Sequence, residues 1–265
     1  MWTKIPILAA CLLLSVSVHA QDTRSSDIPR LANGKPNFSG VWQALTTANW
    51  NILTHGASAG VPQYGALLAT PPGHGIVDGD VIPYLPAAAE QQRRNYENRF
   101  KDDPEVKCFM PGVPRANYMP YPLQIFHSDD RLLVAYQFAG AARIFNLGPP
   151  QPSAIDSWMG VSNARWDGDA LVVDVTGFNG QAWLDRAGNH ASASLHVLER
   201  YAFAGPDAID YSATLEDPKT FSRPWTMHFR LYRNPDPRAH LMEFKCVPFT
   251  EELLYGEFYK RPEKK

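Results

Sequence analysis

The segment 183–192 concentrates side chains that hold or move protons. It contains the carboxylate of Asp185, the guanidinium of Arg186 and the imidazole of His190, close to the indole of Trp183. An aspartate beside a histidine fixes the imidazole tautomer and raises its basicity, as general acid–base catalysis requires. The segment therefore predicts a site where His190 and Asp185 act on a ligand that contacts Trp183. A surface loop with an internal ion pair would have the same composition.

Two carboxylates in predicted strands form a second candidate site. Asp174 lies in a valine-rich strand, and Glu199 shares a strand face with apolar and aromatic residues, opposite His196. If both carboxylates line a cavity, their pKa values separate, so that one serves as acid and the other as base. We accordingly assign catalysis to Glu199 and substrate contacts to Asp174 and His196. Structural pairing with Arg165 or Arg143 explains the same pattern.

A third group of polar residues leads into the predicted strand 123–127. A guanidinium binds a carboxylate or a phenolate in two-point fashion, so Arg115 is a candidate for orienting the substrate. Tyr118 is a second candidate substrate contact, Tyr121 a candidate proton donor, and His127 a candidate base at the strand end. Prolines and tyrosines that merely cap a barrel would produce the same pattern.

The tryptophans separate into two roles. Trp42, Trp166 and Trp225 are interpreted as core residues or plugs of a barrel end. Trp158, close before Gly160, is placed at the mouth of the barrel as a substrate contact.

Familiar catalytic signatures are absent from the sequence. It has no Gly-x-Ser-x-Gly elbow, phosphate-binding loop, dinucleotide fingerprint or His-Glu-x-x-His motif. We therefore expect no cofactor and no metal. A net charge of -2 gives no overall attraction to nucleic acid, so the expected partner is a small hydrophobic or aromatic molecule.

Hydrophobic alternation indicates a mainly β protein. A Gly-rich and Pro-rich covering segment at about 46–122, with a helix at 87–101, precedes most of the strands. Hairpin turns between the strands predict an antiparallel calycin-like or lipocalin-like barrel with a few short helices, and a two-sheet β-sandwich is the alternative. Besides an entry strand near Trp42 and the hairpin around Asp167-Gly168-Asp169, the predicted strands are Leu123 to His127, Arg131 to Phe138, Ala142 to Leu147, Leu195 to Phe203, Asp210 to Glu216, Trp225 to Arg233 and Leu241 to Cys246.

Two features predict an exported protein. Residues 1–20 read as a signal peptide with a small-x-small cleavage site ending at Ala20, which leaves a single domain over 21–265. Removing the signal peptide leaves Cys108 and Cys246, and an even pair in an exported protein is most simply a disulfide. The protein is therefore expected in the periplasm or secreted, without membrane insertion after cleavage. The sequence is compatible with a homo-oligomer.

Several short motifs lie along the mature chain: Gly34 to Trp42, Ala48 to Asn51, Ile82 to Tyr84, Asp103 to Cys108, Pro111 to Arg115, Ser157 to Gly160, Arg165 to Asp174, Trp183 to Asn189, Leu195 to Tyr201, Glu216 to Lys219 and Glu243 to Cys246. Together they resemble an exported bacterial family that is common in soil bacteria and in degraders of aromatic compounds. The resemblance runs through almost the whole mature chain and implies fold and compartment rather than a reaction. Where that family has a histidine and an aspartate, this chain has Ala191 and Ala193.

These observations lead to one expected function and one alternative. The expected function is a cofactor-independent lyase, dehydratase or isomerase that acts by acid–base chemistry on a small apolar, aromatic molecule of the lignin phenolic type. The alternative is a carrier with the same pocket and no chemistry, which the alanines at 191 and 193 favour.

Overall fold

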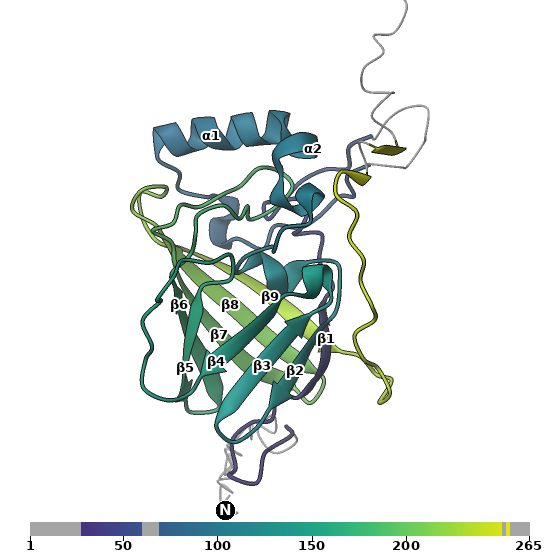
Figure 1. Cartoon of the computed structure of the whole chain (residues 1–265), viewed down its shortest axis with the longest axis vertical. Coiled ribbons are helices and arrows are strands. Elements are labelled where there is room, and N and C mark those ends of the chain that lie inside the picture. The colour runs from purple at the N-terminus through teal and green to yellow at the C-terminus, as the bar shows by residue number, and fades with distance from the viewer. Residues whose placement is uncertain (1–27, 60–68, 251–252, 255–265) are drawn as a thin grey trace, which may run out of the picture.

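The chain folds into a closed barrel of nine strands, as the alternation predicted (Figure 1). The computed structural model describes residues 28–59, 69–250 and 253–254, so the predicted signal peptide lies outside the described residues. The strands are β1 (Gly40–Ala44), β2 (Leu123–His127), β3 (Arg131–Tyr136), β4 (Ala142–Asn146), β5 (Val161–Asp167), β6 (Ala170–Thr176), β7 (His196–Gly205), β8 (Ala208–Glu216) and β9 (Trp225–Arg233). The helices are α1 (Pro86–Glu97) and α2 (Arg99–Asp102), with short 3-10 turns η3 (Asp78–Asp80), η4 (Pro104–Lys107), η5 (Arg115–Tyr118) and η6 (Phe138–Gly140).

Neighbouring strands in the chain are also neighbours in the barrel, and β9 pairs with β1 to close it. One junction departs from the expected antiparallel meander, because β4 and β5 pair in parallel. The connection 147–160 is long enough to carry the chain from one barrel end back to the other, so β5 starts at the same end as β4. The two strands are in register only at Phe145 with Ser162 and Asn146 with Asn163.

The two ends of the barrel differ in how they are covered. At the upper end in Figure 1, the covering segment, with α1 and α2, and the loops 177–195 and 217–224 lie over the strands. The lower end carries the tight hairpin at Gly168, whose φ of +59° suits the two-residue turn. Here Trp42 is fully buried, donates from Nε1 to the carbonyl oxygen of Phe38 at 2.9 Å, and lies under the guanidinium of Arg233.

Side chains fill the barrel interior. In β6 the inward residues Leu171, Val173 and Val175 have almost no accessible surface, and Ile209 and Leu231 are equally buried. A water-sized void next to these side chains would leave them accessible, so the part of the barrel lined by them holds no such void. Any ligand site among the described residues therefore has to be sought at the covered end or on the outer surface.

The C-terminal tail corrects one prediction. Residues 241–246 form no strand, because β1 and β9 already close the barrel and leave no free edge to pair with. The tail instead runs along the outside of the barrel toward the covering segment, where the disulfide Cys108–Cys246 fixes it, as predicted. Among the described residues, no helix combines the length and the apolar character needed to cross a membrane.

Candidate functional site

A buried ion pair lies inside the barrel. Arg143 of β4 donates from Nη2 to Oε2 of Glu199 at 2.5 Å and from Nη1 to Oε1 at 3.2 Å. The same guanidinium donates to Oγ of Ser162 on β5, at 2.8 Å from Nη2 and 3.2 Å from Nε. Both charged side chains are at most 1% exposed. Of the pairings that the sequence suggested for Glu199, the one with Arg143 is therefore confirmed.

Neutral donors complete the coordination of Glu199. Its Oε1 accepts hydrogen bonds from Oη of Tyr201 at 3.0 Å, Oη of Tyr211 at 2.8 Å and Nδ2 of Asn117 at 2.9 Å. Tyr136 in turn donates to Oδ1 of Asn117 at 2.8 Å, and burial raises the pKa of Tyr136 to about 12. The carboxylate is saturated with donors and sealed from solvent, which is how a structural network is built rather than a proton-transfer site.

The other strand carboxylate lies on the outside of the barrel, so its interpretation as a cavity residue is wrong. Asp174 alternates with the inward residues of β6 and is 41% exposed. Its Oδ2 lies 3.0 Å from Nε2 of His196, which β7 also presents outward. Glu199 and Asp174 therefore point to opposite sides of the sheet and cannot share a substrate.

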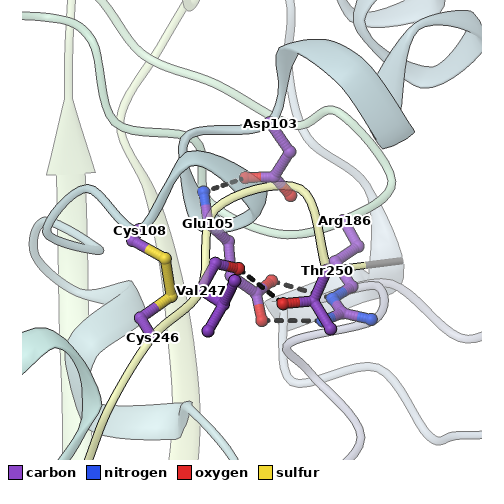
Figure 2. Close-up of a disulfide and its surroundings, with 7 residues drawn as sticks. All are labelled: Asp103, Glu105, Cys108, Arg186, Cys246, Val247 and Thr250. Carbon is purple, nitrogen blue, oxygen red and sulfur yellow. Dashed lines mark hydrogen bonds and ion pairs between the residues drawn. A yellow bond between two sulfur atoms is a disulfide. The ribbon is translucent and has the colours of Figure 1, made fainter. Parts of the chain in front are cut away.

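A second ion network holds the covering segment together. Arg115 donates to both oxygens of Asp103 and to Oε2 of Glu105 at 2.6 Å, and from Nε to Oδ1 of Asn49. Arg186 donates to both oxygens of Glu105 (Figure 2). Burial alone would raise the pKa of Glu105, but the two guanidinium groups outweigh it and lower that pKa. Arg115 is only 1% exposed, so its donors serve the fold in this conformation.

Asp185 joins the loop 183–190 to the covering segment. It accepts hydrogen bonds from the backbone N of Ile52 at 2.9 Å and from both the backbone N and Nδ2 of Asn189, at 3.1 Å and 2.6 Å. Burial raises its pKa to about 6, although these hydrogen bonds oppose the rise. The predicted contact between Asp185 and His190 is replaced by these bonds to neutral amides. Nearby, Tyr118 is fully buried and donates to the carbonyl oxygen of Leu184 at 2.7 Å.

The predicted grouping of His127 with Arg115 and Tyr121 is wrong, because the residues lie at opposite barrel ends. β2 runs from the covered end to the lower end, a rise of about 17 Å over five residues, and His127 is its last residue. Its Nδ1 accepts from the backbone N of Phe38 at 3.3 Å, and its ring stacks with Trp166. Tyr121 packs edge-on against Phe244 of the tail.

An aromatic pocket lies among the loops of the covered end. Trp158 and Trp183, both predicted as substrate contacts, lie in its wall with Phe178. The cavity measures about 10 Å³, room for roughly one water molecule. The remaining lining residues are Val113, Asn179, Gly180, Ala182, Leu184, Ala191, Ser192 and Leu195.

Backbone contacts bring the pocket walls together. Trp183 and His190 form an isolated bridge, and the backbone N of Leu184 donates to the oxygen of Asn189 at 2.6 Å, so the loop closes on itself. His190 directly precedes Ala191 in the chain; Ala191 is part of the wall, and the His190 ring packs against Tyr84 behind it. The pocket therefore shares the segment 183–192 with the predicted proton-transfer residues.

His190 differs from the other candidates because it has hydrogen-bonding capacity to spare. Its Nδ1 is buried and has no hydrogen-bond partner among the described residues. Burial lowers the pKa of its imidazole, and the negative charge of Asp217 partly opposes this. Its backbone N donates to Oη of Tyr84 at 3.1 Å, and the two rings meet edge to face. Neutral imidazole with an unsatisfied nitrogen is the form that can accept a proton.

Two residues near this histidine escaped the sequence reasoning. Asp217, which is 1% exposed, accepts from the backbone N and Oγ of Ser192 at 2.6 Å and 2.8 Å. Tyr84 comes from the covering segment, and burial raises its pKa. Both are far from 183–192 in the chain, so no local spacing connects them with His190.

Comparison of the chain with family models, with curated proteins and with solved structures finds no match. Among the described residues, no group of three or more His, Cys, Asp and Glu side chains is arranged to hold a metal ion. The function is therefore argued from the geometry of the covered end.

Proposed function

We propose that the protein is a cofactor-independent, exported lyase, dehydratase or isomerase that acts on a small aromatic molecule at the pocket beside His190. The observation that carries this proposal is the buried, unpartnered Nδ1 of His190, which directly precedes Ala191 in the wall of the aromatic pocket. Such a nitrogen is normally satisfied in a folded protein, and a catalytic role is one explanation for an exception.

The chemistry follows from the state of the imidazole. Because burial lowers its pKa, His190 is neutral near pH 7 and can take a proton from a bound substrate. Elimination and isomerisation need no external electrons. In a dehydration the imidazole takes a proton from carbon and returns it to the departing hydroxide as water leaves, and in an isomerisation it returns the proton to a different carbon, so one imidazole and a positioned ring balance either step. Trp158, Phe178 and Trp183 offer the apolar surface that a phenolic ring prefers.

A carrier is the second candidate, and one observation favours it. No side chain that lines the pocket is ionisable, because Ala191 stands in the wall where the resembling family has a histidine. In that case the protein retains an aromatic ligand without changing it, and His190 is a bystander.

A turnover experiment separates the two candidates. The mature protein is incubated with a panel of lignin-type phenolics, and bound and released molecules are followed by mass spectrometry. The enzyme predicts a product mass, such as loss of water, that His190→Gln reduces by about 10²- to 10⁴-fold.

The matched control is His228→Gln, because His228 is exposed and paired with Asp78 on the outside of β9. This variant should turn over substrate like the wild type. Retention of an unchanged phenol by both variants would select the carrier. A protein that neither binds nor converts any of the phenols would refute both candidates.

A further inference from the structure

The aromatic pocket, whose wall includes Ala191 directly after His190, is too small for the ligand class proposed for it, so one wall has to move. A cavity of about 10 Å³ admits a water molecule and not a phenolic ring. Pockets of this kind become occupied when a ligand selects a minor conformation with one side chain displaced. The moving wall should be the side chain that is least constrained by its neighbours.

Burial identifies that side chain. Phe178, Leu184, Leu195 and Val113 are 3–6% exposed, and Trp183 is 9% exposed, so all of them are locked into the interior. Trp158 is half-buried and packs against the core from outside. Its outer contact is a stack with Phe109, with ring centroids 5.1 Å apart and planes at 28°. Phe109 itself is 47% exposed.

The backbones that carry these two rings are anchored. The residue before Trp158, Ser157, donates from its backbone N to the oxygen of Gly177 at 2.9 Å, and its Oγ accepts from the backbone N of Gly160 at 3.0 Å. Phe109 donates from its backbone N to the oxygen of Pro104 at 3.0 Å. It directly follows Cys108, which the disulfide ties to the tail (Figure 2). Rotation of the two side chains is therefore the opening that leaves all of these backbone contacts intact.

From these contacts we propose that Trp158 and Phe109 form a gate, in which Trp158 turns outward to admit a monocyclic phenol and Phe109 holds it closed. This inference rests on the proposed function and adds the step that controls entry. In the closed state the ring of Phe109 occupies the outer face of Trp158. In the open state that stack is broken, and the phenolic ring gains a stack with the indole inside.

The gate makes a directional prediction for Phe109→Ala. Breaking one aromatic stack slows opening by about two- to tenfold, and the variant no longer has a stack to break. Its association rate constant with vanillin should therefore rise by about two- to tenfold over wild type, while the dissociation rate changes less. Phe109→Tyr keeps a ring at this position and should associate at the wild-type rate. Stopped-flow fluorescence quenching measures both rates.

The matched control is Phe126→Ala, which removes a phenylalanine of similar exposure, 50%, from the outer face of β2. It should leave vanillin association unchanged. If Phe109→Ala associates at the wild-type rate or more slowly, Phe109 is not a gate, and the proposed function stands or falls separately on the His190→Gln experiment. If neither wild type nor Phe109→Ala binds vanillin, the gate is overturned for monocyclic phenols.

Discussion

The barrel interior and the covered end hold polar groups under opposite conditions. Inside, Glu199 faces a guanidinium, two phenols and an amide, so every donor around it finds an acceptor. At the covered end, His190 keeps a buried nitrogen without a hydrogen-bond partner among the described residues, although the charge of Asp217 acts on its ring. Both residues are buried and only one lacks a hydrogen-bond partner, so burial alone does not mark a functional residue in this protein. The saturated network stabilises one conformation, whereas the unsatisfied group is available to a ligand.

Breaking the interior network should have the largest effect. Arg143→Met removes the guanidinium and leaves Glu199 as an uncompensated buried charge, which typically costs about 3–5 kcal/mol of unfolding free energy. Urea denaturation at pH 7 measures this loss. Arg200→Met, which breaks the exposed pair with Asp167, is the control and should change stability by less than about 1 kcal/mol.

Removing both interior charges sharpens the same comparison. Arg143→Met combined with Glu199→Leu leaves no buried charge, so stability should recover much of the loss. A double variant as unstable as Arg143→Met alone would mean that the tyrosines and Asn117, rather than the ion pair, hold the interior together.

Asp185 provides an intermediate case, because this buried carboxylate has neutral amide donors. Its pKa is raised to about 6 by burial, so between pH 6 and pH 4 the folded state binds a proton that the unfolded state does not. Acidification over this window should stabilise the wild type relative to Asp185→Asn by up to about 3 kcal/mol. Denaturation of both proteins at several pH values gives this difference directly. A wild type that loses stability relative to Asp185→Asn on acidification would contradict the raised pKa and show that Asp185 is held ionised.

His190 should matter least for stability and most for chemistry. His190→Gln removes a ring nitrogen that has no partner, so unfolding free energy should change by about 1 kcal/mol or less. Because burial lowers the imidazole pKa, wild-type turnover should rise with pH and level off, with its midpoint below 6.5. A pH–rate profile with a midpoint above that value would assign the titration to a different group.

The sequence predicted the barrel well because strand alternation is a local property. The hairpin at Gly168 and the alternation of the two faces along β6 and β7 follow from residue order alone. The grouping of His127 with Arg115 failed, because a strand carries its two ends to opposite sides of the molecule and residue spacing does not show this. The parallel junction was missed because nothing in 147–160 indicates which way the chain returns. Asp174 required knowing which side of the sheet faces inward.

The parallel junction between β4 and β5 determines where the backbone pairing of the barrel opens first. Only two residue pairs are in register there, whereas β7 and β8 are matched from His196 to Phe203. Local opening begins where backbone pairing is sparsest, so amide hydrogens near Ser162 should exchange with solvent before those of β7. The side chain of Arg143 spans this junction from β4 to Ser162 and continues to Glu199. From the barrel interior, Arg143 therefore cross-links the strand junction that has the fewest backbone pairs.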